Sequence, residues 1–331
     1  MKLINKFIFT YIKPFQVFIY MGGLANLGST CAINSLIQML CSNAKIREII
    51  LNHNNSSFSK ELSDIFDLLY VQNKSLRPIK FVKFLYKEFA SYFKFGEQID
   101  IVELWMCLHE TLSKEQGCLI NIEKCVAPTF GENDKMINYC NYTISCHNSS
   151  LVSEWCDISQ GITLNYIKCE KCNNIIYNFE PFILLPLDIC ENTNIAEMIE
   201  EYIKPCKLQG DWKCEKCNEY TSYIKINHIW KFPRILTVMI KRFDNNFKKN
   251  NREININPEL NFKNKNIKYS LFSMALHYGN LNNGHYISIC KQNNSYKLFD
   301  DLKVVNIDDN CLKNNKEVYM IMYEISNYLC I

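Results

Sequence analysis

Two identical Cys-Glu-Lys-Cys segments constrain the fold of this chain more than any other feature of its sequence. The first contains Cys169 and Cys172, the second contains Cys214 and Cys217, and 41 residues lie between Cys172 and Cys214. Two thiols separated by two residues bind one metal ion from a tight turn, and two such turns complete a tetrahedral sulfur shell. A redox role for each pair is the alternative, but it explains the duplication poorly. We therefore predict that the two segments meet around one ion.

The expected ion is Zn²⁺, because zinc is the usual occupant of an all-thiolate site. Four protein ligands leave no open coordination position, so the role of the ion would be structural. The predicted ligands are Cys169, Cys172, Cys214 and Cys217, and no organic cofactor is expected. Between the two segments, residues 194–204 carry apolar side chains at helical spacing and predict one short helix.

Composition indicates a globular protein with a large core. The chain has 331 residues, of which 48% are hydrophobic and 21% charged. Its formal net charge of +3 is too close to balance to favour nucleic acid or a membrane surface as a partner. The 17 cysteines are irregularly spaced outside the two segments, which is typical of free thiols in a reducing compartment. We expect an intracellular protein of the cytoplasm or nucleus, without nucleic-acid or membrane partners.

Residues 1–21 are expected to form a poorly ordered N-terminal extension. This stretch is apolar but is interrupted by Lys2, Lys6, Lys13 and Pro14, so no uncharged run reaches transmembrane length. A signal peptide is the alternative, but the apolar block is broken and no convincing cleavage site follows. A start codon placed too early would also explain the stretch, since Met21 directly precedes the first motif.

The chain divides into a helical part followed by a strand-rich part. Residues 33–112 carry apolar stripes at helical spacing, and the last stripe opens with Asp100 and Glu103 in the pattern of a capping box. We interpret both acidic residues as structural. From residue 224 onward, β-branched and apolar runs predict strands. Residues 119–155 show no clear period.

Cys31 has the sequence context of a nucleophile. A helix is predicted to begin close to it, capped by Thr30 or Ser29, because the apolar residues that follow have helical spacing. The helix dipole and unpaired amides at such a position favour thiolate over thiol. Asn26, five residues upstream, is placed to donate to an oxyanion. The alternative is that Cys31 is a small buried residue at a helix start.

A predicted hairpin supplies the partner of the cysteine. If residues 292–295 form the turn, Lys291 pairs with Tyr296, and His285 lies diagonally across from Asp300. A carboxylate at that range orients the imidazole towards a thiolate. Gly284 lets the backbone approach a substrate closely. A histidine of the core or surface is the alternative, and we expect it for His109, His228 and His277.

At this point the residues resemble the ubiquitin-specific protease family. Residues 23–38 are similar to its cysteine box, residues 277–286 to its histidine box, and residues 98–104 to a box between them. Further segments match in the order of the family: 161–172, 180–187, 233–243, 299–301 and 319–323. The resemblance covers the chain from about Gly23 to Tyr323.

The resemblance implies a fold, an activity and a set of site residues. The fold would be the α+β papain-like fold of that family, with a helical thumb (about 22–118), zinc-ribbon fingers (about 155–230) and a β-rich palm (about 231–325) in one catalytic domain, 22–325. The activity would be thiol-dependent hydrolysis at the C-terminal glycine of ubiquitin, by a monomer whose partners are ubiquitin, polyubiquitin and ubiquitinated proteins. The implied catalytic residues are Cys31, His285, Asp300 and Asn26, and the implied substrate-binding residues are Gly284, Tyr286 and Asp301.

The chain also departs from the family pattern. Ser29 stands where the family usually has Asn, and Ala32 where an aromatic residue is usual. Both flank Cys31, so the rate or the fit of the ubiquitin tail is expected to differ. Two other functions remain open from the sequence. One is a protease for a ubiquitin-like modifier, and the other is a catalytically weak ubiquitin-binding scaffold.

Overall fold

The structure is a computed structural model that describes residues 21–53, 56–189, 191, 194–210, 212–280, 283–293 and 295–326. The predicted extension 1–21 therefore lies outside the described residues, apart from Met21. The described helices are α1 (Cys31–Ser42), α2 (Ala44–Asn52), α3 (Ser57–Phe66), α4 (Ile79–Glu88), α5 (Ile101–Glu115), α6 (Asn133–His147), α7 (Glu154–Ser159) and α8 (Ile195–Ile203). None of these helices combines the length and apolarity needed to cross a bilayer.

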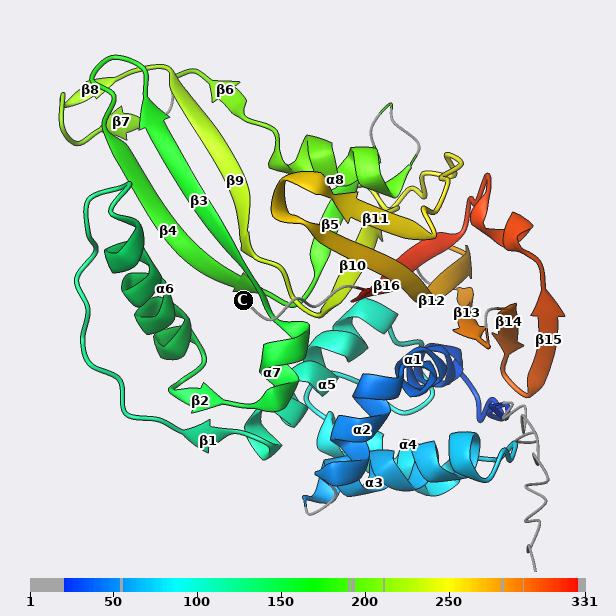
Figure 1. Ribbon diagram of the computed structural model, residues 1–331. Coiled ribbons are helices and arrows are strands. Elements are labelled where there is room, and N and C mark those ends of the chain that lie inside the picture. The colour runs from blue at the N-terminus through cyan, green and yellow to red at the C-terminus, as the bar shows by residue number, and fades with distance from the viewer. Residues whose placement is uncertain are drawn as a thin grey trace, which may run out of the picture.

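The first five helices form one lobe, drawn in blue to teal below the large sheet in Figure 1. Helix α1 is its centre, because every residue from Cys31 to Cys41 is buried. A helix that is buried on all sides must be mostly apolar, as this one is. The predicted apolar stripes of α3, α4 and α5 face the same core. Asp100 caps α5 by accepting hydrogen bonds from the amides of Val102 and Glu103, which confirms its structural role.

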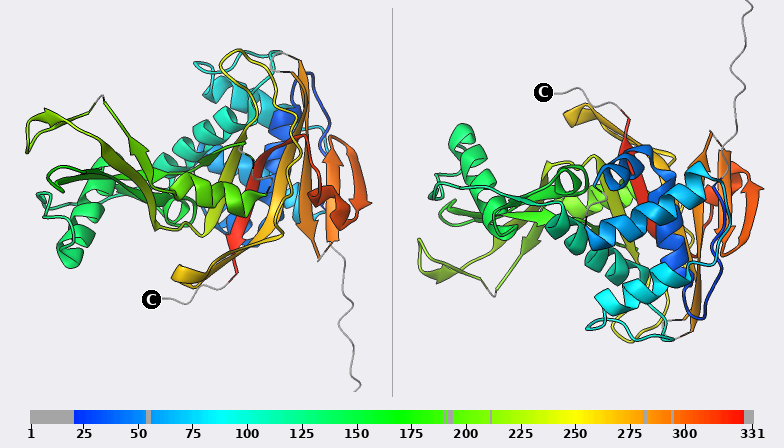
Figure 2. Two further views of the ribbon diagram at one scale, coloured as in Figure 1. Left: turned by 90° about the horizontal axis from the view of Figure 1, so that it is seen from above. Right: turned by 90° about the horizontal axis from the view of Figure 1, so that it is seen from below.

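The large sheet carries the strand-rich part of the chain (Figure 1). Its strand order is β15-β14-β13-β12-β16-β10-β5, and β11 pairs with β12. The strands are β5 (Leu185–Asp188), β10 (Ile235–Lys241), β11 (Glu259–Phe262), β12 (Ile267–Gly279), β13 (Gly284–Gln292), β14 (Ser295–Asp300), β15 (Lys303–Ile307) and β16 (Val318–Ile325). The helical lobe packs on one face and α8 on the other, so each face buries its own apolar cluster (Figure 2).

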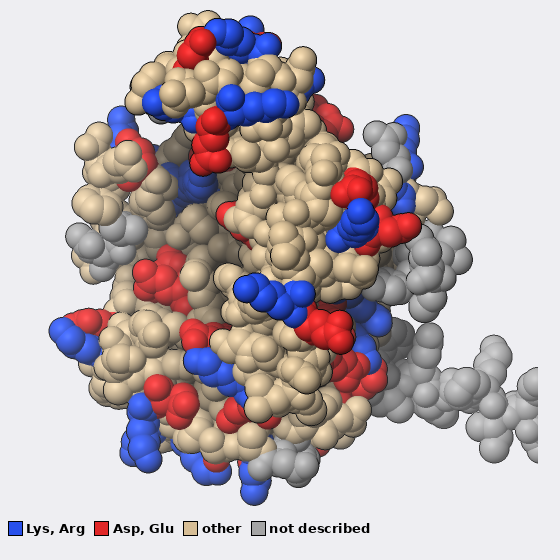
Figure 3. Space-filling view, turned by 90° about the vertical axis from the view of Figure 1, so that its left-hand side faces the viewer, with Lys and Arg blue, Asp and Glu red and all other residues tan. Residues whose placement is uncertain are grey.

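A second, four-stranded sheet extends away from the body of the molecule as the fingers (Figure 1). It is built from β4 (Ile175–Phe182), β3 (Gly161–Cys169), β9 (Tyr223–Lys231) and β6 (Cys206–Leu208), in that order. At its tip, β7 (Lys213–Cys214) pairs with β8 (Glu219–Tyr220). The molecule is hollowed beneath these fingertips, and charges of both signs are scattered over that face (Figure 3).

The helix predicted for residues 194–204 is confirmed by α8, and the strands predicted after residue 224 are confirmed by β9, β10, β12, β13, β14 and β16. The interpretation of residues 119–155 missed α6 and the short pair of β1 (Cys118–Leu119) and β2 (Leu151–Val152). Helix α6 buries only Met136 and Cys140. Its apolar face is therefore too narrow to show a clear period. It docks on Tyr177 and Phe179 of the fingers through Tyr139.

Candidate active site

The loop before α1 sets the position of Cys31. The side-chain oxygen of Asn26 accepts hydrogen bonds from the amides of Gly28 (3.0 Å) and Thr30 (3.3 Å). Gly28 and Ser29 both have positive φ angles, +96° and +56°, which close the loop tightly. Thr30 occupies the N-cap position as predicted, but its side chain makes no capping bond. Its hydroxyl instead accepts from the amide of Leu27 (2.9 Å), so the predicted side-chain cap is wrong.

The Cys31 thiol is buried, with 4% of the residue exposed. Burial and the negative charge of Asp301 raise the pKa of Cys31, against the opposing effect of hydrogen bonds from the backbone of Tyr286, Ala32 and Cys31 itself. The amides at the helix N-terminus lower the pKa of Cys31, as expected. The expectation that the thiolate is favoured is nevertheless wrong for the net pKa, because desolvation outweighs the effect of these amides.

The hairpin of β13 and β14 brings His285 to Asp300. Lys291 pairs with Tyr296, which confirms the predicted register. The ring of His285 lies beside Asp300, with 2.7 Å between Nε2 and Oδ1. A neutral imidazole that donates from Nε2 keeps its lone pair on Nδ1, where it can accept a proton. Part of the predicted turn, Asn294, lies outside the described residues.

Cys31 and His285 lie on elements that pack against each other, because α1 lies against β13. The backbone of Tyr286, the residue after His285, lowers the pKa of Cys31. Within the described part of the chain, no hydrogen bond joins the Cys31 sulfur to the His285 ring, whose bond goes to Asp300. The arrangement therefore places the His285 ring and the Cys31 thiol on neighbouring elements, and burial favours the protonated thiol.

Asp301 links the Cys31 loop to α1. Its carboxylate accepts one hydrogen bond from the side-chain amide of Asn26 (3.0 Å) and one from that of Asn34 (2.7 Å). Asn34 also donates to the carbonyl of Leu24 (3.2 Å). No role was predicted for Asn34, although it stands one turn after Cys31. A polar side chain inside an otherwise buried helix is the signal that points to such a role.

Gly284 and Tyr286 are both held by residues of the helical lobe. The side-chain amide of Gln98 donates to the carbonyl of Gly284 (2.7 Å), and its oxygen accepts from the Gly284 amide (2.8 Å). The Tyr286 ring is buried, and its hydroxyl donates to Asp100 (3.2 Å). The Tyr286 side chain thus faces the core shared with the helical lobe.

The histidines expected in the core include two that the structure places there. His109 and His277 are both buried. Burial lowers the pKa of His109 to about 3. Burial, with the charge of Lys249, lowers the pKa of His277 to about 4. Both rings are neutral at pH 7.

The four predicted metal ligands converge at the fingertips. Their sulfur atoms all lie within 4.8 Å of one another. The two cross-segment contacts are 4.0 Å between Cys169 and Cys217 and 3.6 Å between Cys172 and Cys214. Four thiolates at about 2.3 Å from one tetrahedral ion have sulfurs about 3.8 Å apart. The donor set therefore fits one zinc ion.

A cysteine at a helix start facing a strand that carries a histidine and its carboxylate defines the papain-like class of cysteine peptidase folds. The comparisons with known proteins place the chain more closely. The family model of the ubiquitin carboxyl-terminal hydrolases matches residues 22–323. The chain therefore belongs to this family of cysteine-type deubiquitinating peptidases.

Curated relatives carry the same family name. The chain is 29% identical to ubiquitin carboxyl-terminal hydrolase 4 of Arabidopsis thaliana, over 91% of this chain and 92% of that protein. It is 26% identical to ubiquitin carboxyl-terminal hydrolase Usp2 of Drosophila melanogaster, over 91% of this chain but only 34% of that protein.

Solved structures confirm the fold. A structure of the SAGA deubiquitinating module, Ubp8 with Sgf11, Sus1 and Sgf73 bound to monoubiquitin, matches with a TM-score of 0.72 and 22% identity. The match covers 93% of this chain and 69% of that one. The module bound to ubiquitin aldehyde matches with a TM-score of 0.70 and 23% identity, over 93% and 70% of the two chains.

Proposed function

We propose that this chain hydrolyses the isopeptide or peptide bond at the C-terminal glycine of ubiquitin, with Cys31 as nucleophile, His285 as general base and Asp300 as its orienting carboxylate. The observation that carries this proposal is the His285–Asp300 contact of 2.7 Å at the start of β13, the strand against which α1 and its Cys31 pack. Neither a structural cysteine nor a core histidine requires this arrangement.

The proposed reaction starts from a neutral pair. His285 takes the proton of the Cys31 thiol on Nδ1, and the sulfur attacks the glycine carbonyl carbon. The protonated ring, held by Asp300, then gives its proton to the leaving amine as the C–N bond breaks. A water molecule, deprotonated by His285, attacks the resulting thioester and releases the carboxylate and the free thiol.

The oxyanion of the tetrahedral intermediate needs donors close to Cys31. We assign this role to the side-chain amide of Asn26, which Asp301 already orients through the bond of 3.0 Å. Its oxygen accepts from the amides of Gly28 and Thr30 and one N–H donates to Asp301, so the second N–H is the donor left for a substrate. The amide of Cys31, at the start of α1, is a second candidate donor.

Ubiquitin is the proposed partner. Support comes from the family match over residues 22–323 and from the neighbouring structures, which contain monoubiquitin or ubiquitin aldehyde. The hollow beneath the fingertips gives room for a globular partner beside the large sheet (Figure 3). The neighbouring Ubp8 structure holds Sgf11, Sus1 and Sgf73 as well, so similarity does not favour the expected monomer.

We also propose that the fingertips bind one Zn²⁺ through Cys169, Cys172, Cys214 and Cys217. The sulfur separations support this assignment. A bound ion would crosslink β3 to the β7–β8 pair and leave no position for substrate. Its contribution would be to the folding of the fingers and not to the chemistry at Cys31.

Labelling with a ubiquitin-derived electrophilic probe tests the function. A probe with a reactive group in place of the terminal glycine carboxylate is expected to modify Cys31, located by mass spectrometry of the adduct. Cys31→Ala should abolish labelling, and Cys206→Ala, at an exposed cysteine outside both sites, should leave it intact. Modification of a different cysteine, or undiminished labelling of Cys31→Ala, would remove the nucleophile assignment. Preference for a probe made from a ubiquitin-like modifier would change the substrate.

A further inference from the structure

The end of β12 that pairs with the start of β13 extends past the first residue of β16, the strand on its other side. His285 pairs with Tyr278, and Tyr286 pairs with His277. On the opposite side, Leu276 pairs with Val318, the first residue of β16, after a shift in register. The amide of His277 still reaches the Glu317 carbonyl (2.8 Å), but the amides of Glu317 and Val318 both donate to the side-chain oxygen of Asn315.

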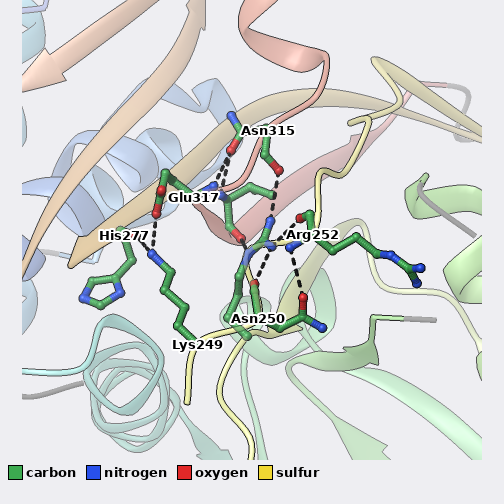
Figure 4. Close-up of polar contacts among 8 residues, drawn as sticks. Lys249, Asn250, Arg252, His277, Asn315 and Glu317 are labelled. Atoms are coloured by element: carbon green, nitrogen blue, oxygen red, sulfur yellow. Dashed lines mark hydrogen bonds and ion pairs between the residues drawn. The ribbon is translucent and has the colours of Figure 1, made fainter. Parts of the chain in front are cut away.

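Lys249 takes the place of the missing strand donor. Its ammonium group donates to the carbonyl of His277 at 2.5 Å and also contacts the carboxylate of Glu317 (Figure 4). The Lys249 side chain is 9% exposed and that of Glu317 26% exposed. Solvent and salt screen so buried a pair weakly, and removal of one partner leaves the other charge uncompensated.

The loop that carries Lys249 is itself anchored. Arg242, which is fully buried, donates to the carbonyls of Val318, Asn250, Arg252 and Asn315. Its own carbonyl accepts from the amide of Asn250 (2.6 Å). Figure 4 shows these contacts beside the Lys249–Glu317 pair. These hydrogen bonds therefore hold the loop, and with it Lys249, against the start of β16.

A chain of contacts leads from Lys249 to the proposed base. The ring of His277 packs against that of Tyr286 in a tilted arrangement, with 4.6 Å between ring centroids. A methyl group added at Gly284 would lie 2.0 Å from Nε2 of His277. His277 thus supports the residues on both sides of His285, and the Lys249–Glu317 pair fixes the backbone of His277.

We propose that Lys249, together with Glu317, is a positioning residue for His285. The inference rests on the proposed function of His285 as general base. It predicts that loss of the pair moves His285 relative to Cys31 and slows the chemical step, while ubiquitin binding stays largely unchanged. A misplacement on the order of 1 Å at a reacting group costs up to about 100-fold in rate.

Steady-state kinetics on a fluorogenic ubiquitin C-terminal amide tests this proposal. Lys249→Met and Glu317→Gln are each expected to lower kcat about tenfold and to leave KM within about twofold, the pattern of an interaction needed for the chemical step. Lys249→Arg, which keeps a charged donor, should retain kcat within about threefold. Lys248→Met is the matched control, because Lys248 is exposed in the same loop, and it should leave both constants unchanged.

Amide hydrogen exchange provides the structural readout and does not depend on activity. Faster exchange in Lys249→Met than in Lys248→Met is expected for the segment 277–286, without a matching change in α3. A raised KM with intact kcat would overturn the proposal by making Lys249 a substrate contact. Equal kcat losses in the Met and Arg variants, or unchanged exchange at 277–286, would also overturn it. An inactive wild-type enzyme whose exchange is nevertheless changed by Lys249→Met would refute the proposed function and not the anchoring.

Discussion

Gly284→Ala is the substitution whose consequence follows most directly from the structure. A Cβ atom built at this position lies 2.0 Å from Nε2 and 2.9 Å from Cε1 of the buried His277. Real Cβ contacts are essentially never shorter than 3.0 Å, so about 1 Å of movement is required. Gln98 holds both backbone polar groups of Gly284, and His277 lies between Tyr286 and Phe243, so neither side yields freely.

The displacement has two measurable costs. Overpacking of this kind destabilises a protein by about 1–3 kcal/mol. The neighbouring His285 moves with its backbone, and a shift of about 1 Å is expected to lower kcat by up to about 100-fold. Both are measured on one preparation, by thermal unfolding and by turnover of a fluorogenic ubiquitin amide.

A control variant and a double variant test whether the steric clash causes these losses. Gly131→Ala strains the backbone at φ +100° but meets no atom within 4 Å and lies far from the site along the chain, so it should cost stability without loss of kcat. Gly284→Ala combined with His277→Ala removes the clashing ring, so kcat should exceed the product of the two single effects. Full activity of Gly284→Ala, or strictly multiplicative losses in the double variant, would refute the steric argument.

Three further predictions concern the fingers, Asp301 and His109. Cys214→Ser should release the zinc of the fingers stoichiometrically, as measured with a chromogenic chelator, and should destabilise the fingers. A fully folded, metal-free wild type would contradict the zinc proposal. Asp301→Ala frees the amides of Asn26 and Asn34 and should lower kcat about 10–100-fold with little change in KM, because orientation of one oxyanion donor is lost. The pKa of His109 is about 3 when folded and about 6.5 when unfolded, so the unfolded chain binds the extra proton and stability falls as pH drops from about 6.5 towards 3. His109→Gln should flatten that part of the dependence of Tm on pH, and an unchanged slope would exclude His109 as its source.

Features specified by local patterns were predictable from the sequence. The β13–β14 register follows from a short turn between two strands predicted from β-branched and apolar runs, and it places His285 diagonally across from Asp300 without knowledge of the rest of the fold. The proximity of the two Cys-Glu-Lys-Cys segments was likewise predictable, because the spacing within each pair of cysteines is typical of metal ligands. The capping role of Asp100 can be predicted from residues 100–103 alone.

Features that depend on distant partners were not predictable. Asn34 acquires its role from Asp301, 267 residues away, and nothing near Asn34 indicates that contact. Lys249 resembles its exposed neighbour Lys248 in sequence, and only the folded position of Glu317 separates them. Helix α6 is polar over most of its surface and is held by the aromatic side chains of the fingers, which a local hydrophobic period does not reveal.

The protonation state of Cys31 shows how such distant contacts alter a local expectation. The helix N-terminus alone would favour a thiolate, but burial, and to a lesser extent the charge of Asp301, raises the pKa of Cys31, and the same carboxylate accepts from the side-chain amide of Asn26. Asp301 therefore adds to an effect that burial dominates. Under the proposed mechanism, the thiolate forms as His285 accepts the proton. In the proposed reaction Asp301 thus has two opposing effects: it orients the Asn26 amide, and it adds to the rise in the pKa of the thiol.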